Sequence, residues 1–145
     1  MATLILGLGN ELLADEGVGI HAVRRMRAEP LPDHVTILEV GTAILDALDY
    51  IAEAERIIVI DAMKADGVPG TVYKIPLADC QGASTIASMH GFDIHRVMAL
   101  AGRSDHPGVM VFGVEPAEVS WSLRLSEAVA ESLEALIAAV VQEFR

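Results

Sequence analysis

Polar side chains, most of them acidic, follow four of the five apolar segments that are short enough to be strands. Gly9-Asn10 comes after the first, Glu39 lies near the end of the second, Asp61 ends the third and Glu115 follows the last. Ligands of open parallel sheets bind beyond the carboxyl ends of the strands, so these residues are expected at one edge. A polar strand end is ordinary by itself. Several carboxylates at one edge oppose one another's ionisation, however, and a bound cation would relieve that repulsion.

Two further positions extend this acidic set. Asp15-Glu16 precedes a predicted helix, where an acid also has a structural explanation, and His90 lies in a polar loop, where a histidine is most often only solvated. Glu, Asp and His together offer oxygen and imidazole ligands, which suit zinc, nickel and similar divalent ions. The sequence therefore predicts a divalent-cation site. The remaining histidines are weaker candidates for its nitrogen ligand: His21, His34, His95 and His106.

The elements that would position these residues alternate along the chain. Apolar and β-branched runs predict strands over 3–8, 35–40, 56–61, 71–75 and 108–114. Helical spacing predicts helices over 17–28, 43–53 and 93–101, and a last helix capped by Ser126.

Strands that are apolar throughout and separated by helices are typical of a parallel sheet covered on both faces. The run 71–75 ends at Pro76, which predicts an edge strand that could run antiparallel. We therefore expect an α/β protein in which residues 1–145 form a single three-layer domain, with helices on both faces of the sheet.

Composition and cysteine usage narrow the class of protein. Apolar residues make up 52% of the chain, yet no apolar run approaches the ~20 residues that span a bilayer. The N-terminus lacks the basic region of a signal peptide. Cys80 is the only cysteine, and the preceding Asp79 supplies the wrong charge for a reactive thiolate, so we interpret it as a small, partly buried side chain. These features favour a cytoplasmic protein with no membrane partner.

Charge and motif content exclude several functions. The formal net charge of −11 disfavours nucleic acid as a partner and favours a protein with a basic or neutral contact surface. Gly7-Leu8-Gly9 does not complete a dinucleotide fingerprint, because Leu12 replaces its third glycine and two acids would face the pyrophosphate. The standard nucleotide and hydrolase motifs are absent from the sequence: Walker A, His-Glu-x-x-His, Gly-x-Ser-x-Gly, Asp-Thr-Gly and Asp-Ser-Gly.

The motifs resemble those of one enzyme family, in order, over nearly the whole chain. Residues 7–19, GLGNELLADEGVG, resemble the opening signature of the nickel–iron hydrogenase maturation endopeptidases. The likeness continues through Gly41-Thr42-Ala43, Asp61-Ala62, His90 and the segment 113–116, Gly-Val-Glu-Pro.

The resemblance implies a twisted, mostly parallel five-stranded sheet and a proteolytic activity. The expected reaction removes the C-terminal extension of a hydrogenase large-subunit precursor after nickel insertion. Carried over by position, Glu16, Asp61 and His90 would be the catalytic and metal-contacting residues. The implied metal is the substrate's own nickel, used for recognition, and zinc or cadmium could occupy the same ligands. Where the family often has Asp-Gly-Gly-Thr, this chain has Glu39-Val40-Gly41-Thr42, which leaves the role of Glu39 open.

Two other functions remain in competition. One is a non-catalytic metal-binding or escort protein of the same fold, which would bind metal without proteolysis. The other is a peptidyl-tRNA hydrolase-like enzyme, whose chain also leads from a first strand into Gly-Leu-Gly-Asn, although the acidic charge opposes an RNA substrate. The sequence decides neither whether the chain forms a homo-oligomer nor which group attacks the peptide bond.

Overall fold

A computed structural model describes residues 2–80, 94–102 and 108–144 of the chain. Five strands form one sheet in the order β2-β1-β3-β5-β4. They are β1 (Thr3–Leu8), β2 (Val35–Gly41), β3 (Arg56–Ala62), β4 (Val72–Pro76) and β5 (Val109–Val114). The first three strands and β5 run parallel, and β4 pairs antiparallel with β5 at the edge of the sheet. The predicted α/β fold and the antiparallel edge strand are therefore confirmed.

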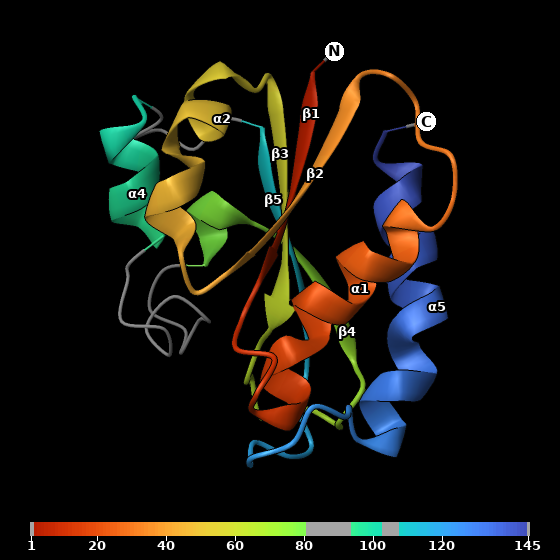
Figure 1. Cartoon of the computed structure of the whole chain (residues 1–145). Helices are drawn as coiled ribbons and strands as arrows, with labels where there is room; N and C mark the ends of the chain where they lie inside the picture. The colour runs from red at the N-terminus through yellow and green to blue at the C-terminus, as the bar shows by residue number, and fades with distance from the viewer. Residues whose placement is uncertain (1, 81–93, 103–107, 145) are drawn as a thin grey trace.

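Helices cover both faces of this sheet, as Figure 1 shows. The pair α1 (Val18–Arg27) and α5 (Glu127–Gln142) lies on one face, and α2 (Leu48–Glu53) and α4 (Ile94–Leu100) lie on the other. Short 3-10 turns complete the described elements: η1 (Ala14–Gly17), η2 (Ile44–Ala47) and η3 (Leu77–Asp79). The helices predicted over 17–28 and 43–53 each begin with such a turn, so their α-helical parts are shorter than expected.

Each face of the sheet has its own apolar core. Ile5 and Phe112 pack on the side of α1 and α5, whereas Leu6 and Val59 pack with Met98 on the side of α2 and α4. Strands buried on both sides need apolar residues at every position, which explains their continuous apolar runs. The predicted apolar stripe of α5 is confirmed, and its N-cap Ser126 accepts the amide of Val129 at 3.4 Å.

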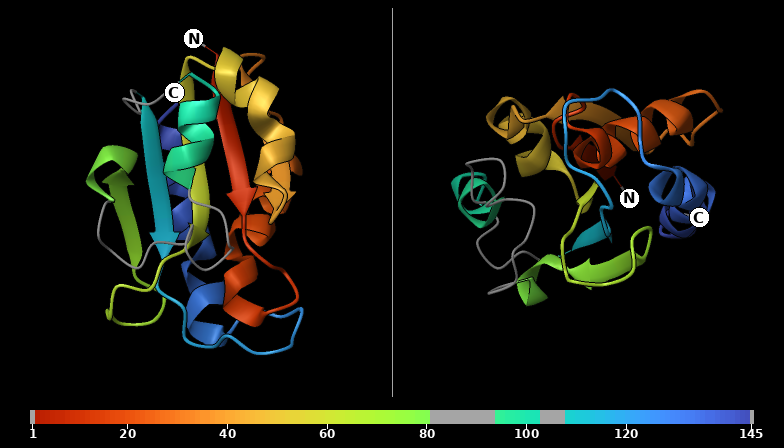
Figure 2. Two further views of the ribbon diagram at one scale, coloured as in Figure 1. Left: turned by 90° about the vertical axis from the view of Figure 1, so that its left-hand side faces the viewer. Right: turned by 90° about the horizontal axis from the view of Figure 1, so that it is seen from below.

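The strand order reverses between β1 and β3, because the chain adds β2 on one side of β1 before it returns to the other. The carboxyl ends of these strands lie at the lower end of the sheet in Figure 1, and Figure 2 shows the same end from below. No helix among the described residues is long and apolar enough to cross a membrane.

Candidate active site

The first loop meets the end of β3 at the point where the strand order reverses. Gly9 has φ +114°, and its amide donates to the carbonyl oxygen of Gly41 at 3.0 Å. A Cβ atom at Gly9 would lie 1.9 Å from the backbone oxygen of Glu16 and 2.8 Å from Oδ1 of Asp61. Only glycine fits this backbone and this space, because φ in that range strains other residues. Its small size lets Glu16 and Asp61 approach the same point.

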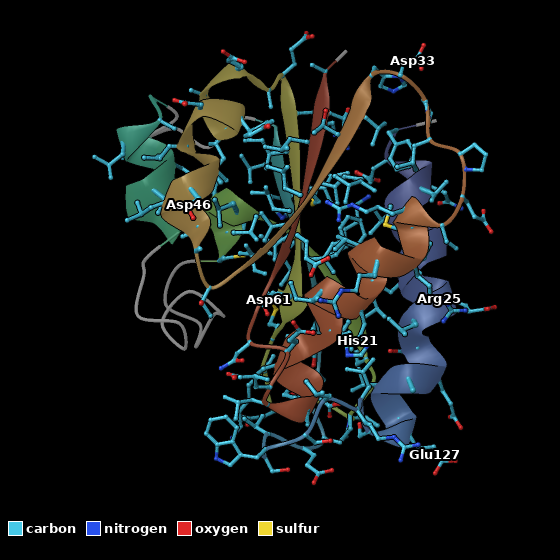
Figure 3. All side chains as sticks on the ribbon, in the orientation of Figure 1. His21, Arg25, Asp33, Asp46, Asp61 and Glu127 are labelled. Carbon is cyan, nitrogen blue, oxygen red and sulfur yellow. The ribbon has the colours of Figure 1, made fainter. Side chains whose placement is uncertain are left out.

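Asp61 is fully buried at the carboxyl end of β3, where Figure 3 labels it. Its Oδ1 accepts the amide of Ala62 at 2.7 Å. Burial raises the pKa of Asp61 well above its ordinary value, the Ala62 amide opposes that shift, and the nearby Glu16 carboxylate adds to it. The two acids are therefore close enough to affect each other's ionisation.

Glu16 belongs to the 3-10 turn η1 and is 4% exposed. Oδ1 of Asn10 accepts the amide of Leu12 at 3.0 Å, and Ala14 takes a left-handed φ of 50°, which together shape the turn. Burial raises the pKa of the Glu16 carboxyl. The sequence-based pairing of Glu16 with Asp61 is consistent with this geometry.

A groove of about 390 Å³ lies beside these acids, between the first loop and the turn after β2. Gly9, which separates Glu16 from Asp61, is one of its lining residues. The groove walls are formed by Gly9, Asn10, Glu11, Leu12, Ile20, Glu39, Val40, Gly41 and Thr42. Glu16 and Asp61 are buried behind Gly9 and do not themselves line the groove.

Asp15 has a role different from that of its neighbour Glu16. Its fully buried carboxylate accepts the amides of Ala117 and Glu118 at 2.8 and 2.9 Å. It also accepts the amide and the hydroxyl of Ser126, both at 2.8 Å. Asp15 therefore ties the first loop to the segment that leads from β5 into α5, and its lone pairs are used in the fold.

Glu39 and Glu115 do not join the acidic pair, which corrects the expectation that the strand-end acids converge. Glu39 forms ion pairs with Arg24 and Arg27 of α1, at 2.6 and 3.6 Å. Arg24 also binds Glu11 at 2.8 Å, so one guanidinium bridges two acids that line the groove.

Glu115 holds the loop between β3 and β4. Its Oε1 accepts the hydroxyl of Tyr73 at 2.6 Å and the amides of Gly67 and Ala65 at 2.8 and 3.0 Å. Burial alone would raise the pKa of Glu115, but these three donors outweigh it and lower the pKa.

The third predicted ligand, His90, lies outside the described residues, as does His106. In the described parts of the chain, no group of three or more His, Cys, Asp or Glu residues could hold a metal ion. His34 is exposed, and its Nε2 contacts the Phe144 carbonyl oxygen at 3.3 Å. Cys80 is 3% exposed, and burial, with a smaller effect of Asp79, raises the pKa of its thiol. The interpretation of Cys80 as a buried small side chain is confirmed.

Sequence reasoning missed two contributors to the site. The sequence places Gly9 at the end of the first strand but does not predict its role as a spacer, although a glycine directly after an apolar strand indicates close backbone approach. Arg24 was not a predicted site residue. Its bridge between Glu11 and Glu39 joins residues that are 28 positions apart, so no local pattern could reveal it.

Chemically, the site presents two buried carboxyl groups, and burial raises the pKa of each. A divalent cation would oppose that rise, because its positive charge lowers the pKa of both carboxyls. The resulting oxygen donors suit a divalent ion, and an imidazole would complete a mixed set suited to nickel or zinc.

The comparisons with known proteins agree with this arrangement. Residues 20–143 match the family model of hydrogenase maturation proteases. The chain is 36% identical to the hydrogenase expression/formation protein HupD of Rhodobacter capsulatus, over 98% of the chain and 70% of that relative.

Two solved structures have the same fold. The hydrogenase maturating endopeptidase HybD from E. coli gives a TM-score of 0.86 at 26% identity, covering 100% of this chain and 93% of that one. The hydrogenase maturation protease HybD from Thermococcus kodakarensis gives 0.82 at 26% identity and covers both chains fully, at 100%. The chain therefore belongs to the hydrogenase maturation protease family, endopeptidases that cleave the C-terminal end of a hydrogenase large subunit.

Proposed function

We propose that this endopeptidase recognises the nickel carried by its large-subunit precursor through Glu16, Asp61 and His90, and then removes the C-terminal extension. The observation that carries the proposal is the pair of buried carboxyls beside the groove, Glu16 and Asp61, each with a raised pKa. In this reading nickel is part of the substrate. The protein itself acts in the cytoplasm, where the precursor is made.

The raised pKa values give this recognition a physical basis. Ionising both carboxyls costs free energy in the metal-free protein, because each is buried and each charge opposes the other. A divalent ion offsets that cost, whereas a precursor without nickel brings no compensating charge. Binding therefore discriminates loaded from unloaded precursor, and zinc or cadmium is expected to occupy the same ligands.

The hydrolysis itself is assigned to water. Cys80 is buried with a raised thiol pKa, which makes it a poor nucleophile. Water adds to the scissile carbonyl carbon, the C–N bond breaks, and the departing amine receives a proton. The nickel held by the acidic pair fixes the precursor so that its C-terminal segment lies in the groove.

A cleavage assay with matched precursors tests the proposal. Purified protein is incubated with nickel-loaded and with nickel-free precursor, and mass spectrometry follows the loss of the C-terminal extension. We expect only the loaded precursor to be cut. Equal cleavage of the two precursors would exclude nickel recognition, and metal binding without any cleavage would instead indicate an escort protein.

Single variants test the three residues separately. Glu16→Gln, Asp61→Asn and His90→Ala are each expected to slow cleavage by on the order of 100-fold. Glu29→Gln and Asp33→Asn are matched controls, since both acids are exposed at the opposite end of the sheet, where Figure 3 labels Asp33. The proposed ligand set is wrong if the three variants cleave as fast as these controls.

A further inference from the structure

Four large apolar side chains are exposed next to the groove, on two segments that are distant in sequence. Leu12 is 49% exposed, Val119 47%, Trp121 80% and Leu123 61%. We call them the Trp121 patch. Apolar side chains this exposed are common singly, but a group of them marks an interaction surface. In the sequence, Val119, Trp121 and Leu123 alternate with Ser120 and Ser122.

Backbone hydrogen bonds join the two segments of the patch into one unit. The amide of Ser122 donates to the carbonyl oxygen of Leu12 at 2.9 Å, and the amide of Ala14 donates to that of Ser122 at 2.8 Å. Leu13 and Ser122 thereby form a parallel bridge. Trp121 and Leu123 flank Ser122, so the backbone that carries them is held against the segment of Leu12.

The buried Asp15 anchors the same unit to the core. It accepts the amides of Ala117 and Glu118 on one side of the patch and both donors of Ser126 on the other. A binding surface that is already ordered loses less conformational entropy on association. The backbone of the patch is therefore already ordered before a partner binds, although its side chains are exposed.

The patch also continues into the groove. Leu12 belongs to the patch and lines the groove, and Glu16 follows in the same loop. A partner seated on Trp121 would thus have a neighbouring segment at the groove and the acidic pair.

We propose that the Trp121 patch is the docking surface for the folded body of the precursor whose C-terminal segment enters the groove. This inference rests on the proposed function. The matching surface on the precursor is apolar, because an exposed tryptophan ringed by aliphatic side chains is typical of a binding hot spot.

Charge favours this occupant over a second copy of the chain. Two copies carry −11 each and repel one another, whereas a partner with a neutral or basic rim does not. Glu118 and Glu127 lie in or beside the patch segment and are exposed, and Arg124 is the one base between them. The rim on the precursor is therefore expected to carry lysine or arginine.

Steady-state cleavage of whole nickel-loaded precursor tests the docking role. Trp121→Ser and Leu123→Ser are expected to raise KM on the order of 10- to 30-fold, with kcat changed less than about twofold. Leu100→Ser is the matched control, because Leu100 is 71% exposed on α4, which covers the other face of the sheet. Circular dichroism and a melting curve establish that each variant is folded. Unchanged KM in both patch variants would overturn the proposal.

A label on the patch gives a second, direct readout. Trp121 is the only tryptophan, so 5-fluorotryptophan places a single fluorine in the chain. We expect its ¹⁹F resonance to shift or broaden when unlabelled nickel-loaded precursor is added, and to stay independent of protein concentration without it. A resonance that does not respond to the precursor, or one that changes with protein concentration alone, would contradict the proposal.

The two proposals fail in different ways. If wild-type protein cuts loaded and nickel-free precursor equally, nickel recognition is wrong, and the KM of Trp121→Ser on that same cleavage still tests the patch. If only the loaded precursor is cut but the patch variants match Leu100→Ser, nickel recognition stands and docking at the patch is wrong.

Discussion

The carboxylate of Asp15 accepts both the backbone amide and the hydroxyl of Ser126, each at 2.8 Å, across 111 positions of sequence. This contact links the loop that carries Glu16 to the first turn of α5. It also distinguishes two adjacent acids, because Asp15 is saturated with protein donors while Glu16 lies beside Asp61 with a raised pKa. Asp15 holds the loop in place, whereas Glu16 is the acid that we propose as a nickel ligand.

Replacing Asp15 is therefore expected to damage the fold rather than the chemistry. Asp15→Ala removes the buried acceptor of four hydrogen bonds and leaves three backbone amides without it, which should cost about 2–4 kcal/mol of unfolding free energy. Asp15→Asn retains one acceptor oxygen, so its unfolding free energy should lie between those of wild type and Asp15→Ala. Urea unfolding measures both. Glu16→Gln, the neighbouring control, should stay within about 1 kcal/mol of wild type, and a similar loss in Glu16→Gln would refute the division of roles.

Asp61→Asn should stabilise the metal-free protein at neutral and alkaline pH. A carboxyl with a raised pKa in the fold contributes stability that is complete below its unfolded pKa and is lost as the pH rises through its folded pKa. Asparagine never ionises, so the variant should melt roughly 3–6 °C above wild type at pH 8. The difference should vanish near pH 4.

Melting curves from pH 3 to 9 measure this effect. The exposed Asp33→Asn serves as control and should follow wild type throughout. A deficit of stability in Asp61→Asn at pH 8 would mean that ionised Asp61 is favoured by the fold, against its raised pKa.

Gly9→Ala should unfold the site through a clash with backbone. Its Cβ would lie 1.9 Å from the Glu16 carbonyl oxygen at φ +114°, so both strain and overlap act, and we expect a loss above about 3 kcal/mol. Gly102→Ala is a matched control: its φ is +80° and no atom of the described residues lies within 4 Å of its Cβ position, so only strain of about 1–2 kcal/mol is expected. Urea midpoints and soluble yield compare the two. Equal losses of stability in the two variants would contradict the conclusion that only glycine fits between Glu16 and Asp61.

Tyr73→Phe should lower the stability of the protein at neutral pH. Its hydroxyl is one of three donors that lower the pKa of Glu115, against the effect of burial. A lowered carboxyl pKa gives stability that is present above the unfolded pKa and is lost as the pH falls through the folded pKa. The variant should therefore lose about 1–2 kcal/mol at pH 7, and the loss should shrink below about pH 4.

The same contact has an alkaline signature. Hydrogen bonding to Glu115, with smaller effects of burial and neighbouring acids, raises the pKa of Tyr73 to about 12. Absorbance at 295 nm should show a phenol ionising there in wild type and not in Tyr73→Phe. If wild type and Tyr73→Phe show the same absorbance change near pH 12, the hydrogen bond between Tyr73 and Glu115 is contradicted.

The sequence by itself determined the elements and the general place of the site. Continuous apolar runs defined β1 and β3 because a strand buried on both faces needs apolar residues at each position. Pro76 marked the edge strand because proline cannot donate to a ladder, and Ser126 marked the start of α5 by its local capping bond. Strand-end acids pointed to one edge, since parallel strands end together.

Only the tertiary structure decided what each acid does. Glu39 accepts a hydrogen bond from Arg24, Glu115 from Tyr73 and Asp15 from Ser126, and each partner is distant in sequence. Burial, not residue type, raised the pKa of Asp61, and Gly9 mattered because its Cβ position is occupied by Glu16. Hydrogen-bond partners and desolvation depend on which atoms surround a group in space, so spacing along the chain could name the acids but not their partners, and only the family resemblance singled out Glu16 and Asp61.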